Sequence, residues 1–179
     1  KPNAQRLATI ARELVAIVKR HDATRPVTSA LALPELSNLT GYAQALDVVG
    51  YNYKEHLYQE DHQKYPKHIL LGSENSHEPE AWLHVKHNRY ISAQFLWTGV
   101  DYLGEAHGWP IRISQAGLLD TAGFEKPRFA LRKALWTQEL CAHLAVGKKD
   151  QLWRSDFVWT GTPGETVPVL VFTNGDYAV

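Results

Sequence analysis

Short apolar runs alternate with helical segments along much of the chain, and this alternation constrains the fold more than any other feature. The runs begin about every 20 residues and cover residues 27–31, 47–53, 68–73 and 91–97. Parallel strands cannot be joined by a tight turn and need a crossover, usually a helix, between them. The pattern therefore predicts an α/β fold built on a parallel sheet.

The clearest helical segment is the amphipathic one at residues 3–20. Its apolar residues recur at three- and four-residue steps, at Leu7, Ile10, Ala11, Leu14, Val15 and Val18. Further helices are predicted at 36–46, 58–65 and 80–85, and another opens at Lys126-Pro127 and continues to residue 135. Between the last run and that helix we expect a glycine-rich loop through Gly104, Gly108 and Gly117.

The number of strand–helix units indicates half of a barrel. A complete (β/α)8 TIM barrel takes about 250 residues, so four units would make half of one. After about residue 138 the pattern changes to strand candidates at 140–146, 156–160 and 167–173, with a turn at 161–164. We expect residues 1–139 to be half of a TIM-barrel catalytic domain and residues 140–179 to be a linker and the beginning of an all-β domain.

The composition argues against several classes of protein. Lys plus Arg and Asp plus Glu both number 19, so the net charge is zero, and neither nucleic acid nor a membrane surface is expected as a partner. The single cysteine, Cys141, excludes an internal disulfide and a CxxC site. No apolar run approaches the roughly 20 residues that span a bilayer. Because methionine is missing even at position 1, we expect a piece of a longer polypeptide, and its compartment stays open.

Glu74 is the leading candidate for chemistry. It comes directly after the third apolar run, and a carboxylate at the carboxyl end of a parallel strand lies where α/β enzymes keep their active sites. Retaining glycosidases use two such carboxyl groups about 5–5.5 Å apart, one of them as the nucleophile. The alternative is an ordinary loop glutamate that caps a helix or pairs with a basic residue.

Five further residues are candidates for binding a substrate. Asn52 and Tyr53 end the second run, where a tyrosine can donate a hydrogen bond to a neighbouring carboxylate. His77 can bond a sugar hydroxyl, Trp97 can stack on a sugar ring, and Asp101 can bond a hydroxyl or orient a neighbour. The alternatives are barrel packing for both aromatic residues and a cap or loop bond for Asp101.

The chain is rich in aromatic residues and lacks several common motifs. It has six tryptophans and eight tyrosines, most of which we expect in packing. Trp109, in Gly108-Trp109-Pro110, is a weaker candidate for a sugar platform or an interdomain contact. No GxSxG elbow, P-loop or GxGxxG fingerprint occurs, which argues against a serine hydrolase of that type and against common nucleotide-binding sites.

Taken together, the motifs resemble those of family 2 glycoside hydrolases, most closely the bacterial β-galactosidases. Each motif is weak alone, but five occur in the family's order and at its spacing, over about residues 1–140. They are residues 25–28, 47–53, 72–77, 94–102 and 117–120 followed by Lys126-Pro127.

The resemblance implies a fold and a set of roles. The four strands would be the last four of the catalytic TIM barrel, and the tail would be the linker and the start of a β-sandwich domain. Glu74 matches the nucleophile, and Tyr53 matches a tyrosine that contacts it. His77 and Trp97 match residues that line the galactose pocket. The expected substrate is a terminal β-D-galactoside.

Several departures from the family's pattern bear on activity and cofactors. The acid/base glutamate of the family lies in an Asn-Glu pair before the first predicted strand, and nothing here matches it, nor the magnesium ligands beside it. Ala116 replaces a sodium-binding asparagine. We expect no cofactor in this segment, with Mg or Na in the parent protein. The Asn-x-Lys of glucuronidases does not follow Trp97, which favours a neutral sugar.

We therefore expect a retaining β-galactosidase whose isolated segment has little or no activity. The alternatives are another family 2 activity such as β-mannosidase and a non-catalytic carbohydrate-binding or structural segment. The oligomeric state is open, and a homo-oligomer formed through exposed barrel edges is one outcome.

Overall fold

The structure is a computed structural model that describes residues 4–147 and 162–176. The chain divides into two compact units, residues 1–96 and 97–179. Within the described residues no helix is both long and apolar enough to cross a membrane. The predicted domain boundary between residues 139 and 140 stays a prediction.

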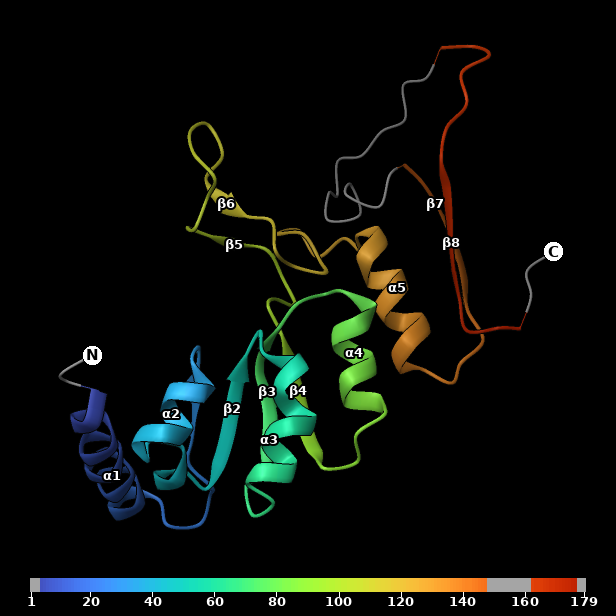
Figure 1. Ribbon diagram of the computed structural model, residues 1–179. Helices are drawn as coiled ribbons and strands as arrows, with labels where there is room; N and C mark the ends of the chain where they lie inside the picture. The colour runs from blue at the N-terminus through green and yellow to red at the C-terminus, as the bar shows by residue number, and fades with distance from the viewer. Residues whose placement is uncertain (1–3, 148–161, 177–179) are drawn as a thin grey trace. The chain divides into compact units, whose positions relative to one another are not determined.

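The first unit is built on one parallel sheet of four strands in the order β1-β2-β3-β4 (Figure 1). Every neighbouring pair is parallel, so the predicted α/β fold with a parallel sheet is confirmed. Closure into a barrel stays a prediction. The strands are β1 Thr28–Leu31, β2 Val48–Asn52, β3 Leu70–Asn75 and β4 Ile91–Leu96.

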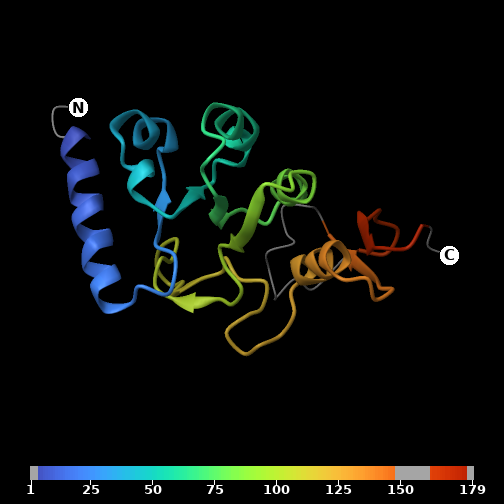
Figure 2. The same ribbon diagram turned by 90° about the horizontal axis from the view of Figure 1, so that it is seen from below.

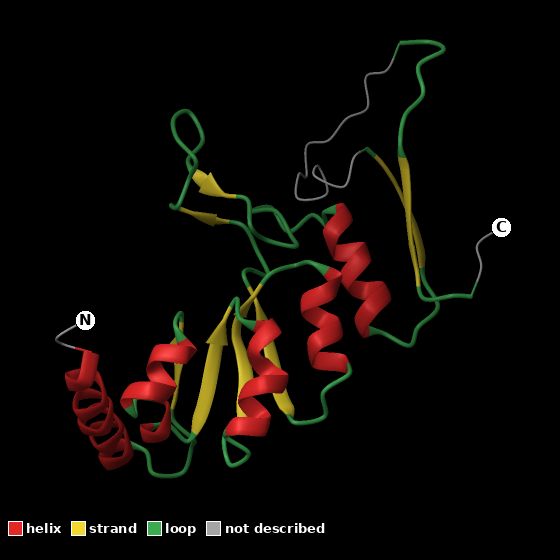
Figure 3. Ribbon diagram, in the orientation of Figure 1, coloured by secondary structure: helices red, strands yellow, loops and turns green. Residues whose placement is uncertain are grey.

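The crossovers between the strands are helical, as predicted. Three helices, α2, α3 and α4, lie on the same side of the sheet (Figure 2), and Figure 3 shows their alternation with the strands. The helical segments of this unit are α1 Ala4–His21, α2 Pro34–Thr40, the 3₁₀ turns η1 Ala43–Ala45 and η2 Glu55–Leu57, α3 Tyr58–Lys64 and α4 Pro79–Lys86.

The segment predicted as one helix over 36–46 is two shorter pieces. Gly41 ends α2 in the left-handed conformation, with φ of 82°. A glycine adopts this conformation without the steric cost of a Cβ and is a common helix terminator. The chain then turns once more in η1 before β2 begins.

Helix α1 is amphipathic as predicted, but its buried stripe is made of small residues. Ala4, Ala8 and Ala11 are buried, whereas the larger apolar residues Leu7 and Leu14 are 44% and 54% exposed in the described structure. Alanine allows a close approach to α2, since a Cβ on Gly41 would lie 3.8 Å from that of Ala8. The buried side chains described in α1 are therefore small ones, while Leu7 and Leu14 keep much of their surface exposed.

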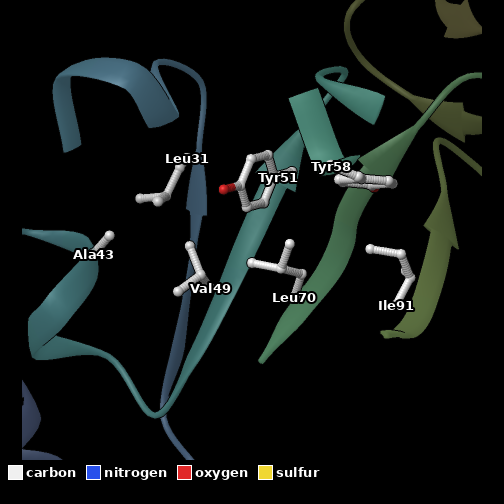
Figure 4. Packing of buried hydrophobic residues seen from close by; sticks show 7 residues of the cluster. All are labelled: Leu31, Ala43, Val49, Tyr51, Tyr58, Leu70 and Ile91. Atoms are coloured by element: carbon white, nitrogen blue, oxygen red, sulfur yellow. The ribbon is translucent and has the colours of Figure 1, made fainter. Parts of the chain in front are cut away.

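The core lies between the sheet and its helices (Figure 4). Its centre is aromatic, with the rings of Tyr51 and Tyr58 edge to face at 5.4 Å between centroids. The Tyr51 hydroxyl donates to the buried Asp61 carboxylate at 2.7 Å, and Asn38 donates to the same oxygen at 3.1 Å. The members of the buried cluster are Leu31, Ala43, Val49, Tyr51, Tyr58, Leu70 and Ile91.

These two tyrosines predict how stability changes at high pH. Burial raises the pKa of Tyr58 to about 12, and burial together with Asp61 raises the pKa of Tyr51 further. In the unfolded chain both hydroxyls ionise near pH 10. Between about pH 10 and 12 the folded protein thus holds more protons, and the free energy of unfolding should fall as pH rises.

Urea titrations of wild-type protein and Tyr58→Phe at pH 9 and pH 11.5 check this. The variant, which has one fewer shifted hydroxyl, should lose less stability between the two pH values than the wild type. An equal or larger loss in Tyr58→Phe would show that this hydroxyl does not stay neutral in the folded protein.

In its described residues, 97–147 and 162–176, the second unit contains one helix and two small antiparallel pairs. β5 Tyr102–Leu103 pairs with β6 Ile113–Ser114, and β7 Ala142–Val146 pairs with β8 Val169–Thr173. Helix α5, Pro127–Trp136, follows the glycine-rich loop as predicted. The strands predicted at 140–146 and 167–173 are confirmed. The short β5–β6 pair lies in the segment predicted as loop, and the strand predicted at 156–160 lies outside the described residues.

Candidate active site

The carboxyl ends of β2 and β3 bring three of the candidate residues together. Asn52 is the register partner of Glu74 across the two parallel strands. The backbone N–H of Tyr53 donates to the Glu74 carbonyl at 2.8 Å. The Ser73 hydroxyl donates to Oδ1 of Asn52 at 3.3 Å. Glu74 therefore lies beside the two residues that the sequence places at the end of the preceding strand.

Glu74 lies inside the third strand rather than directly after it. The strand was predicted to end at residue 73, but β3 continues to Asn75. Its pairing with β2 is irregular, because Tyr51 pairs with Gly72 and the next residue, Asn52, pairs with Glu74. Apolarity alone could not predict this extension, since the last four residues of β3 are small or polar.

Tyr53 has an unusual backbone conformation. Its φ is +52°, the left-handed region that few non-glycine residues adopt. Such a conformation costs on the order of 1–3 kcal/mol, and residues that keep it cluster at functional sites. The side chain is 43% exposed. A tyrosine kept only for packing would be more buried, so this placement favours a role at the strand end.

His77 lies between β3 and α4 and is buried. It follows Glu74 by three residues, in the loop that leaves the sheet. Because the imidazole of His77 is buried, it is packed against its surroundings rather than free on the surface. His77 and Glu74 belong to the same short segment of the chain.

In the second unit, Trp97 is partly accessible. Its side chain is 37% exposed, and its ring meets that of Tyr102 edge to face at 5.8 Å. The Tyr102 hydroxyl donates to Glu105, and this bond raises the pKa of Tyr102. The peptide between Trp97 and Thr98 is cis. The indole of Trp97 thus contacts the Tyr102 ring edge to face and keeps part of its surface accessible.

Asp101 is buried in an ion pair. Its Oδ1 accepts from Nζ of Lys126 at 2.6 Å and from the backbone N–H of Gly117 at 2.8 Å. Both charged side chains are about 1% exposed, and Lys126 also donates to the carbonyl of Gln115 at 3.0 Å. These contacts favour the orienting role of Asp101 over a direct bond to a sugar hydroxyl.

Lys126 is the residue of this cluster that sequence reasoning missed. It precedes Pro127, and the sequence Lys126-Pro127 predicts only the start of a helix. A lysine in that position is normally solvated, and no local signal distinguishes one that is buried against a carboxylate 25 residues earlier.

Trp109 is highly exposed, at 79%. The guanidinium of Arg112 lies 4.8 Å from the centre of its ring. One face of the indole thus carries a cation–π contact. Both roles predicted for Trp109, a sugar platform and an interdomain contact, stay predictions.

The described residues 4–147 and 162–176 contain no group of three His, Cys, Asp or Glu side chains placed to hold a metal ion. Ala116, where the family's sodium ligand would be, offers only backbone groups. The absence of a cofactor from this segment stays a prediction.

Comparisons with known proteins show which family the chain is similar to. No family model matches the chain. It is 29% identical to the β-galactosidase BoGH2A of Bacteroides ovatus, over 92% of the chain and 24% of that protein. A solved structure of a glycosyl hydrolase family 2 member from Bacteroides cellulosilyticus matches it with a TM-score of 0.81 and 26% identity, over 96% of the chain and 26% of that structure. These matches confirm the resemblance to glycoside hydrolase family 2 over most of the chain.

The chain also matches a protein of Formosa agariphila that is provisionally named a β-glucuronidase. The identity is 31%, over 53% of the chain and 9% of that protein. The chain thus spans about a quarter, or less, of the length of the relatives it matches.

Proposed function

We propose that this chain is the nucleophile-bearing part of a family 2 glycoside hydrolase, a retaining exo-β-galactosidase that acts on terminal β-D-galactosides. The observation that carries the proposal is Glu74 at the carboxyl end of β3, in register with Asn52 and bonded through its carbonyl to Tyr53. The similarity to a β-galactosidase over 92% of the chain supports the choice of sugar.

The proposed architecture is the second half of a (β/α)8 TIM barrel followed by the start of a β-sandwich domain. Support comes from the four parallel strands in sequential order and from the antiparallel β7–β8 pair after α5. In a complete barrel the carboxyl ends of the strands form the catalytic face. Glu74 and Asn52 lie at such ends.

In the proposed mechanism the Glu74 carboxylate attacks the anomeric carbon of the galactoside. The bond to the leaving oxygen breaks while an acid/base carboxyl group, supplied by a part of the protein outside this chain, donates a proton to that oxygen. The same group then takes a proton from water, which attacks the galactosyl ester and restores Glu74. Two inversions give net retention.

The other candidate residues take supporting roles. Tyr53 is proposed to donate a hydrogen bond to Glu74, while Asn52 and His77 bond hydroxyls of the sugar. Trp97 is proposed to stack on the C–H face of the ring. Asp101 acts indirectly, through the loop that it holds with Lys126.

The isolated chain is proposed to have little or no activity, because it lacks the acid/base carboxyl group and half of the pocket. Residues of this chain use no cofactor in the proposed steps, and Mg or Na is proposed only for the parent protein. A carbohydrate is the proposed partner, and a homo-oligomer of the parent protein stays a prediction.

A panel of aryl β-glycosides tests the sugar preference of the full-length protein. We expect hydrolysis of the β-galactoside to be fastest, with β-anomeric galactose as the first product seen by NMR. Faster hydrolysis of the β-mannoside or β-glucuronide would replace galactose by that sugar. An α-anomer as the first product would contradict the retaining mechanism, and no hydrolysis of any glycoside would favour a non-catalytic segment.

A further inference from the structure

Strand β3 contains one more residue than either of its neighbours over the same stretch. Gly72 and Glu74 pair with the consecutive residues Tyr51 and Asn52 of β2. On the other side, Gly72 and Asn75 pair with Gln94 and Leu96 of β4, so three steps match two. An extra residue relative to a partner strand is a β-bulge, and here it comprises Ser73 and Glu74.

The face of the sheet that the helices cover holds the residues on both sides of the bulge. Leu70 belongs to the core cluster on that face. A Cβ on Gly72 would point to the same face, because it would lie 2.7 Å from the hydroxyl of Tyr58 and 1.8 Å from Oδ1 of Asn75. Gly72 and Asn75 therefore share the helix-covered face.

Ser73 and Glu74 lie on the opposite face. A Cβ on Gly50 would lie 2.9 Å from that of Ser73, and the Ser73 hydroxyl bonds Asn52. Paired residues of neighbouring parallel strands share a face, so Glu74 shares the face of Asn52. Two consecutive residues of β3 thus face the same way.

Regular alternation of side chains along β3 would have placed the Glu74 carboxylate on the helix-covered face. Starting from Gly72 on the helix-covered face, a period of two returns Glu74 to that same face, beside the core. The extra residue reverses this outcome. It keeps Asn75 on the helix-covered face while Glu74 turns to the side on which a barrel would bind its substrate.

The bulge is held by the side chain of Asn75. Asn75 is fully buried, and its amide donates to Glu55 and, at 3.4 Å, to the hydroxyl of Tyr58. Its Oδ1 accepts no hydrogen bond from the described residues. A buried polar atom without a partner costs free energy, so its presence needs a structural reason. That oxygen occupies the space which a side chain on residue 72 would fill.

We propose that Gly72 and Asn75 are positioning residues that lock this bulge and thereby aim the Glu74 carboxylate at the anomeric carbon. The proposal rests on the proposed function, since it presumes that Glu74 is the nucleophile. In this proposal residue 72 lacks a side chain because Asn75 must occupy the space beside it and so orient Glu74, and not because the backbone turns there.

The test uses Gly72→Ala in the full-length protein. The added methyl group displaces Asn75 and releases the bulge, and a misplacement of the nucleophile by about 1 Å is expected to cost about 100-fold in kcat. KM should change far less, because the sugar contacts remain. The rate of covalent inactivation by a 2-deoxy-2-fluoro-β-galactoside should fall in parallel with kcat, which loss of stability alone would not cause.

A second variant deletes Ser73, which restores regular alternation between Gly72 and Asn75. Asn75 stays anchored, but the carboxylate moves back by about 3.3 Å along the strand, so inactivation by the fluoro sugar should be lost although the protein folds. The matched control is Leu31→Ala, a core truncation two strands away. It should lower the melting temperature and leave kcat at 25 °C unchanged.

The outcomes separate the two proposals. Fluoro-sugar attached to Glu74 in the wild type, with wild-type inactivation rates in both folded variants, would overturn the positioning role alone. Attachment to another residue of the wild type would instead overturn the proposed nucleophile. If Gly72→Ala fails to fold by circular dichroism, the Ser73 deletion decides, and a wild-type rate in it overturns the proposal.

Discussion

Replacing Glu74 by Gln in the full-length protein is expected to lower kcat/KM for an aryl β-galactoside by at least about 10⁴-fold. Removal of a covalent nucleophile costs factors of this order in enzymes whose other groups remain in place. Glutamine keeps the size of the side chain and can retain its neighbours in β2, so the loss should lie in kcat. An amide oxygen is too weak a nucleophile to form the glycosyl intermediate.

Glu80→Gln is the matched control, because Glu80 is an exposed glutamate at the start of α4, six residues after Glu74. It should retain wild-type kcat/KM. Steady-state rates of the two variants, with folding checked by circular dichroism, decide the point. A Glu74→Gln variant within tenfold of the wild type would contradict the assignment of the nucleophile.

The largest effect on stability is expected from Lys126→Met. Among the described residues, the change leaves the buried Asp101 carboxylate with the N–H donor of Gly117 and without the cation that neutralises it. Breaking one side of a buried ion pair costs about 3–5 kcal/mol. Urea unfolding of the protein should show a loss of this size, and the loop between Gln115 and Lys126 should become sensitive to protease.

Two comparisons separate this effect from the loss of any lysine. Lys133→Met removes an exposed pair with Glu139, at 3.9 Å and with side chains 43% and 74% exposed, and should cost about 0–1 kcal/mol. Asp101→Asn combined with Lys126→Met removes both charges and should recover part of the loss. Equal destabilisation by Lys126→Met and Lys133→Met would contradict the importance of the buried pair.

Much of the first unit could be predicted because its signals are local. The apolar runs of β1 and β2 and the periodic spacing in α1 are visible within a few residues, and their predicted bounds agree with the structure to within a residue or two. The break at Gly41 was missed because a glycine inside a helical pattern is also compatible with an uninterrupted helix.

The features that shape the candidate site depend on contacts between distant segments. The bulge at Ser73 and Glu74 is defined only by pairing with β2 and β4. The burial of Lys126 depends on a partner 25 residues away. Motif resemblance could indicate that Glu74 matters, but the register that turns it away from the core required the sheet.

The assignment of Glu74 as the nucleophile is tested most directly by finding which residue a fluoro sugar labels. The full-length protein is incubated with a 2-deoxy-2-fluoro-β-galactoside that has a good leaving group, digested, and sequenced by mass spectrometry. If Glu74 is the nucleophile, a fluorogalactosyl ester is expected on the peptide that contains Gly72-Ser73-Glu74-Asn75, with fragments that locate it on Glu74. A stable label on any other residue would contradict this assignment.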